Sequence, residues 1–110
     1  MKLLFAFVQN DDVKPLTRAL IKSNISVTRI SSSGGFLSSS NSTLMIGVEA
    51  ARLQETLEII EKHSQRREAA MASLASTMSQ SIGNISLMPI NVTIGGATVF
   101  VVDVESSYRF

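Results

Sequence analysis

The chain has 110 residues, of which 45% are hydrophobic and 17% charged, so it has the size and apolar content of one folded domain and is not a disordered chain. Ten Lys and Arg residues face nine Asp and Glu residues, for a net charge of +1. This lacks the basic excess of a protein that binds nucleic acid through its phosphates. There is no Cys and a single His, which excludes disulfides, thiol chemistry and multi-His metal sites within one subunit.

The N-terminal apolar run is too short to be a targeting or membrane segment. Residues 3–8 are apolar and are followed by the polar sequence Gln-Asn-Asp-Asp. A secretory core needs about 7–15 apolar residues and a membrane span about 18 or more. We therefore expect no membrane insertion and a cytoplasmic location.

The first half of the sequence alternates between strand-like and helix-like patterns. A short apolar run bounded by turn residues comes first. Apolar residues at helical spacing follow, preceded by Asp11 and Asp12, which can cap a helix N-terminus. Two partly alternating apolar runs come next. The predicted elements are a strand at 2–9, a helix at about 12–23, and strands at 25–31 and 43–48.

The second half predicts one more helix and two closing strands. Leu53, Leu57 and Ile60 recur at helical spacing, and the opposite face of that segment is charged. Near the C-terminus, two β-branched runs are separated by Gly95-Gly96. The predicted elements are a helix at about 50–63 and strands at 90–94 and 97–104.

This order of elements is a βαββαβ unit followed by an extra C-terminal strand. We therefore expect an α+β fold, a ferredoxin-like sandwich in which two helices cover one face of an antiparallel sheet. The runs at 2–8 and 97–104 are nearly continuous in apolar residues, which predicts that both faces of the sheet are covered. Because the two helices cover only one face, we expect another subunit on the second face and hence a homo-oligomer.

Residues 31–43 form the most informative local feature. Gly35 and the glycine before it allow backbone N–H groups to approach an anion, and Asn41 can donate or accept hydrogen bonds. Phe36 and Leu37 are a large apolar pair that could stack on a flat heterocycle. The alternative is a flexible hairpin loop whose Phe packs on its own core. The sequence lacks Gly-Lys-Ser/Thr and Gly-x-Gly-x-x-Gly, so neither a P-loop nor a dinucleotide fingerprint is present.

The Gly95-Gly96 pair is the second candidate feature, and no catalytic set accompanies either one. The pair predicts a tight turn or bulge between strands, or else a close backbone approach to a ligand or a neighbouring subunit. His63 ends a predicted helix, and no nucleophile, base and orienting group can be assembled around it. We therefore expect a protein that is not an enzyme.

Several segments form a specific signature when they are taken together and in order. They are Met-Lys-Leu-Leu-Phe-Ala-Phe-Val-Gln-Asn-Asp-Asp at the N-terminus, Ser-Gly-Gly-Phe-Leu at 33–37, Asn41 with Thr43, Gly47-Val48, and Gly-Gly-Ala-Thr-Val-Phe-Val at 95–101. This combination resembles the cyclic-di-AMP receptor family of PII-like signal-transduction proteins. The resemblance extends over nearly the whole chain and is weakest over about 69–88.

The resemblance implies a single PII-like domain over residues 1–110 of a bacterial, cytoplasmic homotrimer. It implies a ferredoxin-like subunit with loops at about 31–42 and 64–88. The ligand would be cyclic di-AMP, bound at subunit interfaces without any further cofactor. Ligand binding would rearrange the loops and so signal to a downstream protein partner that the sequence does not identify.

The resemblance also implies which residues contact the ligand. Phe36 and Leu37 would pack on adenine, Asn41 would hydrogen-bond the base or ribose, and the glycines would offer backbone contacts and room. The residues implied are Asn24, Thr28, Gly35, Phe36, Leu37, Asn41, Gly47, Gly95, Phe100 and Arg109.

Two positions depart from the family pattern. Ser26 stands where the family has an Arg that faces phosphate, and Arg109 stands where the family has Gln. Loss of such a charge-assisted hydrogen bond weakens binding by about 1.5–3 kcal/mol unless Arg109 or Arg29 replaces it. The alternatives are therefore a trimeric PII-like interaction protein that has lost or changed its nucleotide and, from a third class, a small ferredoxin-like enzyme.

Overall fold

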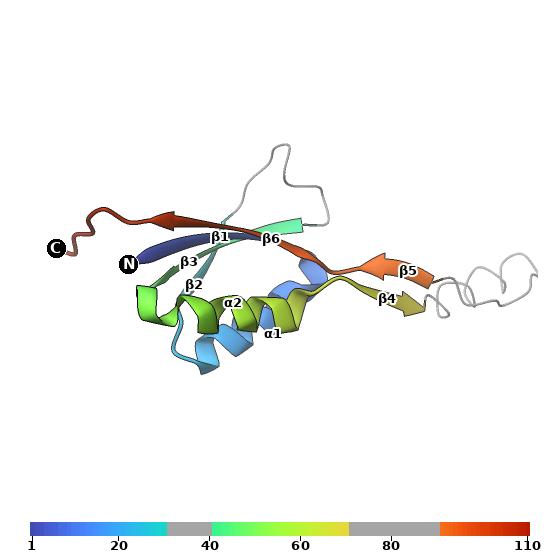
Figure 1. The fold of residues 1–110 in the computed structure, drawn as a ribbon. Coiled ribbons are helices and arrows are strands. Elements are labelled where there is room, and N and C mark those ends of the chain that lie inside the picture. The colour runs from blue at the N-terminus through green and yellow to red at the C-terminus, as the bar shows by residue number, and fades with distance from the viewer. Residues whose placement is uncertain (31–40, 71–90) are drawn as a thin grey trace, which may run out of the picture.

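The computed structural model describes residues 1–30, 41–70 and 91–110 (Figure 1). Their helices and strands occur in an order that begins with a strand–helix–strand–strand–helix series. In chain order the elements are β1 (Lys2–Gln9), α1 (Asn10–Lys22), β2 (Val27–Ile30), β3 (Asn41–Val48), a 3₁₀ helix (Ala50–Arg52), α2 (Leu53–Ser64), β4 (Arg67–Ala70), β5 (Asn91–Ile94) and β6 (Ala97–Asp103).

The main sheet has four strands in the order β2-β3-β1-β6, and each neighbouring pair is antiparallel. Both helices lie on the same face of this sheet (Figure 1). The molecule is therefore a small α+β fold that is compatible with the expected ferredoxin-like arrangement. The strand at 97–104 was expected to be an extra strand after the βαββαβ unit. In the structure this strand is β6, and it pairs with β1 in the main sheet. The described residues after β6, 104–110, contain no further strand.

Strands β4 and β5 leave the main sheet and form a separate two-stranded ribbon. The ribbon projects from the end of the body opposite to the two chain termini (Figure 1). The family resemblance implied a loop over about 64–88. Instead, β4 occupies Arg67–Ala70, because pairing with β5 overrides the weak strand propensity of Arg-Glu-Ala-Ala.

The hydrophobic core lies between the helices and the sheet. Successive strand residues point to opposite faces, so one alternate set from each central strand is buried. Complete burial of one Leu or Ile side chain contributes about 1.5–3 kcal/mol to stability. The core residues are Leu4, Ala6 and Val8 of β1, Leu44, Ile46 and Val48 of β3, Val13, Leu16 and Leu20 of α1, Ile25, and Ile60 of α2.

The other face of the sheet carries no helix of the described residues, and it is also apolar. We call it the open face. The strand register places Phe5 beside Met45 on one side and beside Phe100 on the other. Phe100 is 44% exposed and Val102 is 47% exposed. The two apolar faces expected from the sequence are thus present, and the covering subunit stays a prediction.

Helix α1 begins two residues earlier than expected, and its N-terminus differs from the predicted one. Gln9 occupies the N-cap position without a side-chain hydrogen bond, so neither Asp11 nor Asp12 is the cap. Asp12 is instead buried in the first turn, at 2% exposure. Its carboxylate lies near the positive end of the helix dipole. It pairs with Arg67, which is far away along the chain.

Candidate functional site

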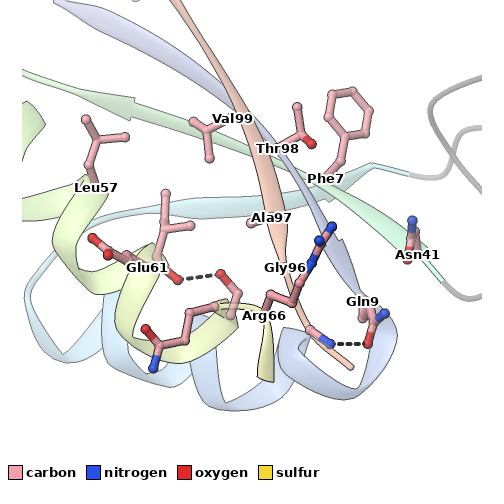
Figure 2. Close-up of a pocket in the computed structure, with 14 residues that line it drawn as sticks. Phe7, Gln9, Asn41, Leu57, Glu61, Arg66, Gly96, Ala97, Thr98 and Val99 are labelled. Carbon is pink, nitrogen blue, oxygen red and sulfur yellow. Dashed lines mark hydrogen bonds between the residues drawn. The ribbon is translucent and has the colours of Figure 1, made fainter. Parts of the chain in front are cut away.

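A cleft of about 510 Å³ opens where β1 ends, β3 begins and the chain passes from α2 to β4 (Figure 2). It extends around β6, which is an edge strand of the main sheet. In Figure 2, Phe7, Thr98 and Asn41 lie on one side of β6, and Leu57 and Glu61 lie on the other. The lining consists of Phe7, Gln9, Asn41, Leu57, Ile60, Glu61, Ser64, Gln65, Arg66, Gly95, Gly96, Ala97, Thr98 and Val99.

The lining combines the chemical groups that a nucleotide needs. Phe7 supplies an aromatic ring, and Gln9 and Asn41 supply amides that both donate and accept hydrogen bonds. Arg66 is exposed, and its guanidinium points to the side of β6 where Asn41 lies (Figure 2). A guanidinium in that position can pair with an anion such as a phosphate.

The Gly95-Gly96 pair shapes the wall of the cleft. Both residues have positive φ, +79° and +96°, a conformation that glycine adopts at no steric cost. The Gly95 N–H donates to Gln9 Oε1 at 2.7 Å, and the Gly96 N–H donates to the Ser64 carbonyl. These bonds fix the point at which the chain returns from the ribbon to the main sheet. The expected bulge between two strands is therefore a bend between two sheets.

An ion pair ties the base of the ribbon to α1. Arg67 Nη2 donates to Asp12 Oδ1 at 2.7 Å, and the Asp12 side chain is only 3% exposed. The hydrogen bond to Asp12 raises the pKa of the Arg67 guanidinium above its ordinary value. Arg67 also donates to the Gln65 carbonyl, so it links both ends of the turn between α2 and β4.

Three of the sequence-predicted residues share the open face. Thr28 lies in the same cross-strand row as Phe100, through Met45 and Phe5. Gly47 lies in the next row, beside Leu3. Phe100 contacts Phe7 edge to face, with ring centroids 6.0 Å apart and an interplanar angle of 84°. The open face is therefore continuous with the Phe7 side of the cleft.

The remaining predicted residues lie in other parts of the molecule. Asn41 and Gly95 line the cleft together. Asn24 adopts positive φ (59°) in the turn after α1, and Arg109 is exposed in the C-terminal segment. Gly35, Phe36 and Leu37 lie outside the described residues, so their predicted contacts are outside them as well.

The family model described as "Cyclic-di-AMP receptor" matches residues 1–110. The chain belongs to the cyclic-di-AMP receptor family. The resemblance drawn from the sequence is confirmed over the full length of the chain.

A solved structure supports the fold of this cyclic-di-AMP receptor family member. A crystal structure of a functionally unknown protein from Pediococcus pentosaceus ATCC 25745 matches with a TM-score of 0.77 and 40% sequence identity. The match covers 99% of this chain and 96% of that one. The two proteins therefore share their fold over nearly the full length of both chains.

Sequence reasoning missed several residues of the cleft in this family member. Phe7 and Gln9 were assigned only to a strand, and Arg66 was given no role. Alternate burial along β1 separates Phe5, Phe7 and Gln9 from the buried set, but the apolar run is nearly continuous in the sequence and does not show which face the helices cover. No sequence pattern indicated that Arg66 would lie beside Gly96, because that contact depends on the path of the ribbon.

The described part of the receptor-family chain carries neither a membrane helix nor a metal-ligand cluster. No helix in residues 1–30, 41–70 or 91–110 is both long and apolar enough to span a bilayer. Within the same ranges, no three His, Asp or Glu side chains gather as a metal site would require.

Proposed function

We propose that the protein is a PII-like signal-transduction receptor that binds cyclic di-AMP between the subunits of a homotrimer. The match of the cyclic-di-AMP receptor family model to the whole chain carries this proposal. The protein acts by binding and not by catalysis, it needs no cofactor, and it works in the bacterial cytoplasm.

The chemistry of the cleft supports a nucleotide ligand. An aromatic ring, two amides and a guanidinium line it, and they match a base, its hydrogen-bonding edge and a phosphate. Asn41 and Gly95 contact the ligand from this side. Phe36 and Leu37 pack on adenine, as the family resemblance implies.

The spacing along β3 supports a site shared between subunits. Asn41 and Gly47 belong to the same strand, six residues apart, which separates them by about 20 Å at roughly 3.3 Å per residue. Asn41 lines the cleft, whereas Gly47 lies near Thr28 at the other end of the strand. In the proposed site, one subunit contributes Thr28 and Gly47, and its neighbour contributes the cleft.

The open face supports self-association. Phe100 and Val102 are nearly half exposed on a face that no helix of the described residues covers. Monomeric proteins rarely leave large contiguous apolar patches in water. Burial of this face against two other copies gives the trimer, and it brings Phe100 beside the neighbouring cleft.

Residues of the turn after α1, of β2 and of the C-terminal segment complete the proposed site. Asn24 and Thr28 contact the ligand from β2 and the turn before it, and Arg109 contacts it from the C-terminal segment. Ser26 directly precedes β2 and supplies no cation. Arg29 follows Thr28 in β2 and faces the opposite side of the sheet, so Arg109 and Arg66 are the guanidiniums available for the phosphates. Rearrangement of the segments at about 31–42 and 64–88 transmits the signal to the downstream partner.

The test is isothermal titration of cyclic di-AMP into the purified protein, with the molar mass of the same sample measured by light scattering. We expect one ligand per subunit and the mass of a trimer. Recovery of intact ligand after overnight incubation would exclude a phosphodiesterase. No heat of binding from a folded trimer would contradict the receptor function.

A glycine variant tests the shared site directly. A methyl group added at Gly47 meets no atom within 4 Å in the subunit, so Gly47→Ala leaves the fold intact. If Gly47 makes room for the ligand, the same variant weakens cyclic di-AMP binding by about tenfold, because an unrelieved contact costs more than 1 kcal/mol. Unchanged affinity would remove Gly47 from the site.

The second candidate is a trimeric PII-like interaction protein that has lost or changed its nucleotide. Ser26, which lacks the phosphate-facing charge of the family, favours it. A thermal-shift screen with cyclic di-AMP, cyclic di-GMP, ATP and AMP separates the two candidates. Stabilisation by cyclic di-AMP alone supports the receptor, whereas stabilisation by none of them supports the interaction protein.

A further inference from the structure

A groove between α1 and β2 concentrates positive charge, and we call it the basic groove. It encloses about 400 Å³ and lies away from the ligand cleft. Three cations and no acid line it, although the whole chain carries only +1. The rest of the chain is therefore net acidic. The lining consists of Val13, Lys14, Thr17, Arg18, Val27 and Arg29.

The charges of the basic groove are not neutralised within the chain. Every charged residue lies in the described segments, because the stretches 30–48 and 69–102 contain none. Within those segments neither Lys14 nor Arg18 forms an ion pair. They stand four residues apart on α1, where like charges destabilise a helix unless an anion approaches. The ion pairs present are Lys2–Asp103, Arg52–Glu55 and Arg67–Asp12.

The third cation is held in place by the sheet. Arg29 Nη2 donates to Ser42 Oγ at 2.7 Å, and Ser42 Oγ in turn donates to Asn10 Oδ1. The planar guanidinium has five N–H donors, and Arg29 as a whole is exposed. The remaining donors are thus presented to the basic groove in a fixed orientation.

The shape and lining of the basic groove fit an extended chain. β2 is an edge strand of the main sheet, so an extended segment can lie along it. The buried side chain of Val13 and the half-buried one of Val27 form an apolar floor between the cations. This surface accepts acidic side chains at its rim and a small apolar side chain at its centre.

We propose that the basic groove is a docking site for an acidic, extended peptide segment of a partner protein. The carboxylates of the segment pair with Lys14, Arg18 and Arg29, and its apolar side chain covers Val13 and Val27. Nucleic acid fits less well, because a phosphate backbone needs a wider basic surface than three cations on a chain of net charge +1. The proposal does not depend on cyclic di-AMP being the ligand of the cleft.

The test uses a fluorescent peptide of alternating Glu and Val as the probe, measured by anisotropy at low ionic strength. We expect the peptide to bind, and Lys14→Gln with Arg18→Gln to weaken binding by about fivefold to tenfold, as expected for two partly exposed ion pairs. The matched control is Lys22→Gln with Lys62→Gln, which removes the same charge from exposed positions outside the basic groove. The control is expected to change the affinity less than twofold.

Several results would overturn the proposal. They are no binding of the acidic peptide, equal weakening by the two double variants, or binding of the matching Lys and Val peptide as tightly as the acidic one. A short DNA duplex that outcompetes the acidic peptide would reassign the basic groove to nucleic acid. Circular dichroism is used to check that the variants are folded. Their titration with cyclic di-AMP is a separate readout, so failure of peptide binding does not count against the ligand of the cleft.

Discussion

Gly95 and Gly47 are glycines for different reasons. Gly95 has positive φ, and a Cβ on it would lie 2.5 Å from the Gln65 carbonyl oxygen and closer still to the Arg67 guanidinium. Gly47 has ordinary strand geometry and open space where its side chain would be. Gly95 is therefore required by the fold, whereas the role proposed for Gly47 requires a ligand.

The free energy of unfolding of alanine variants distinguishes a glycine that the fold requires from one that it does not. Gly95→Ala is expected to lower the free energy of unfolding by about 1–3 kcal/mol, because a β-carbon is strained at this φ and meets backbone. Gly47→Ala is the matched control and is expected to change it by less than about 0.5 kcal/mol. Urea denaturation followed by circular dichroism measures both. Equal stability of the two variants would show that the bend tolerates a side chain.

At the scale of elements, the Asp12–Arg67 ion pair connects α1 to the ribbon. Arg67→Met is expected to lower the melting temperature, because it leaves a nearly buried carboxylate without its cation. Addition of Asp12→Asn to that variant is expected to restore part of the loss, because it removes the unpaired charge. Thermal denaturation of the two single variants and the double variant measures this coupling.

The exposed ion pair Arg52–Glu55 is the control for the Asp12 and Arg67 variants. Its side chains are 37% and 48% exposed, and Glu55→Gln is expected to leave the melting temperature nearly unchanged. A double variant less stable than Arg67→Met alone would contradict the assigned role of Asp12.

A third ion pair predicts how stability depends on pH. Lys2 donates a hydrogen bond to Asp103 at the end of the β1–β6 pairing, and this bond lowers the pKa of Asp103. A carboxylate whose pKa is depressed in the folded state stabilises the fold above its unfolded pKa of about 4, and the gain is lost as the pH falls through the folded pKa. Asp103→Asn is expected to be slightly less stable than the parent at about pH 7 and equal to it near pH 2. A melting-temperature difference that persists in acid would contradict this origin.

The elements with a recognisable apolar or β-branched pattern could be predicted from the sequence, and the one strand without such a pattern could not. β1 was predicted with its observed bounds because its apolar run ends at a polar sequence. α2 was predicted to begin at 50, where the structure has a 3₁₀ helix before α2. β4 was missed because its four residues have no strand pattern and depend on pairing with β5. Local patterns thus define elements that bury their own apolar face, and not those that depend on a distant partner.

The candidate site divides in the same way. Asn41 and Gly95 were noted for their residue types and named as ligand contacts through the family resemblance, and the cleft brings them together. Phe7, Gln9 and Arg66 were missed because their place depends on which face of β1 the helices leave open and on the turn from α2 to β4. The contacts of the predicted ligand residues with a nucleotide stay a prediction.

At the scale of the whole molecule, the open face is the surface through which we propose that the subunits associate. If the proposed trimer forms through the open face, Phe100→Ser is expected to shift the protein from trimer toward monomer, because Phe100 is 44% exposed on the edge strand of that face. Ile21→Ser is the matched control, since Ile21 is 60% exposed but lies on α1. Light scattering during size-exclusion chromatography measures both masses. A trimeric Phe100→Ser variant, or a dissociated Ile21→Ser variant, would move the interface away from the open face.

The anchored bend at Gly95-Gly96 determines where the gene of such a protein can change in length. A single residue inserted between Gly96 and Ala97 would exchange the two faces of β6, so that Phe100 would turn toward the helices and Val99 toward the open face. A codon inserted between residues 71 and 90 is expected to have no such effect. The hydrogen bonds of Gly95 and Gly96 to Gln9 and Ser64 hold the start of β6 in place, so each residue of β6 keeps its face. Relatives that diverge by insertion and deletion are therefore expected to vary in length beyond the ribbon and to keep the count from the bend to β6 constant.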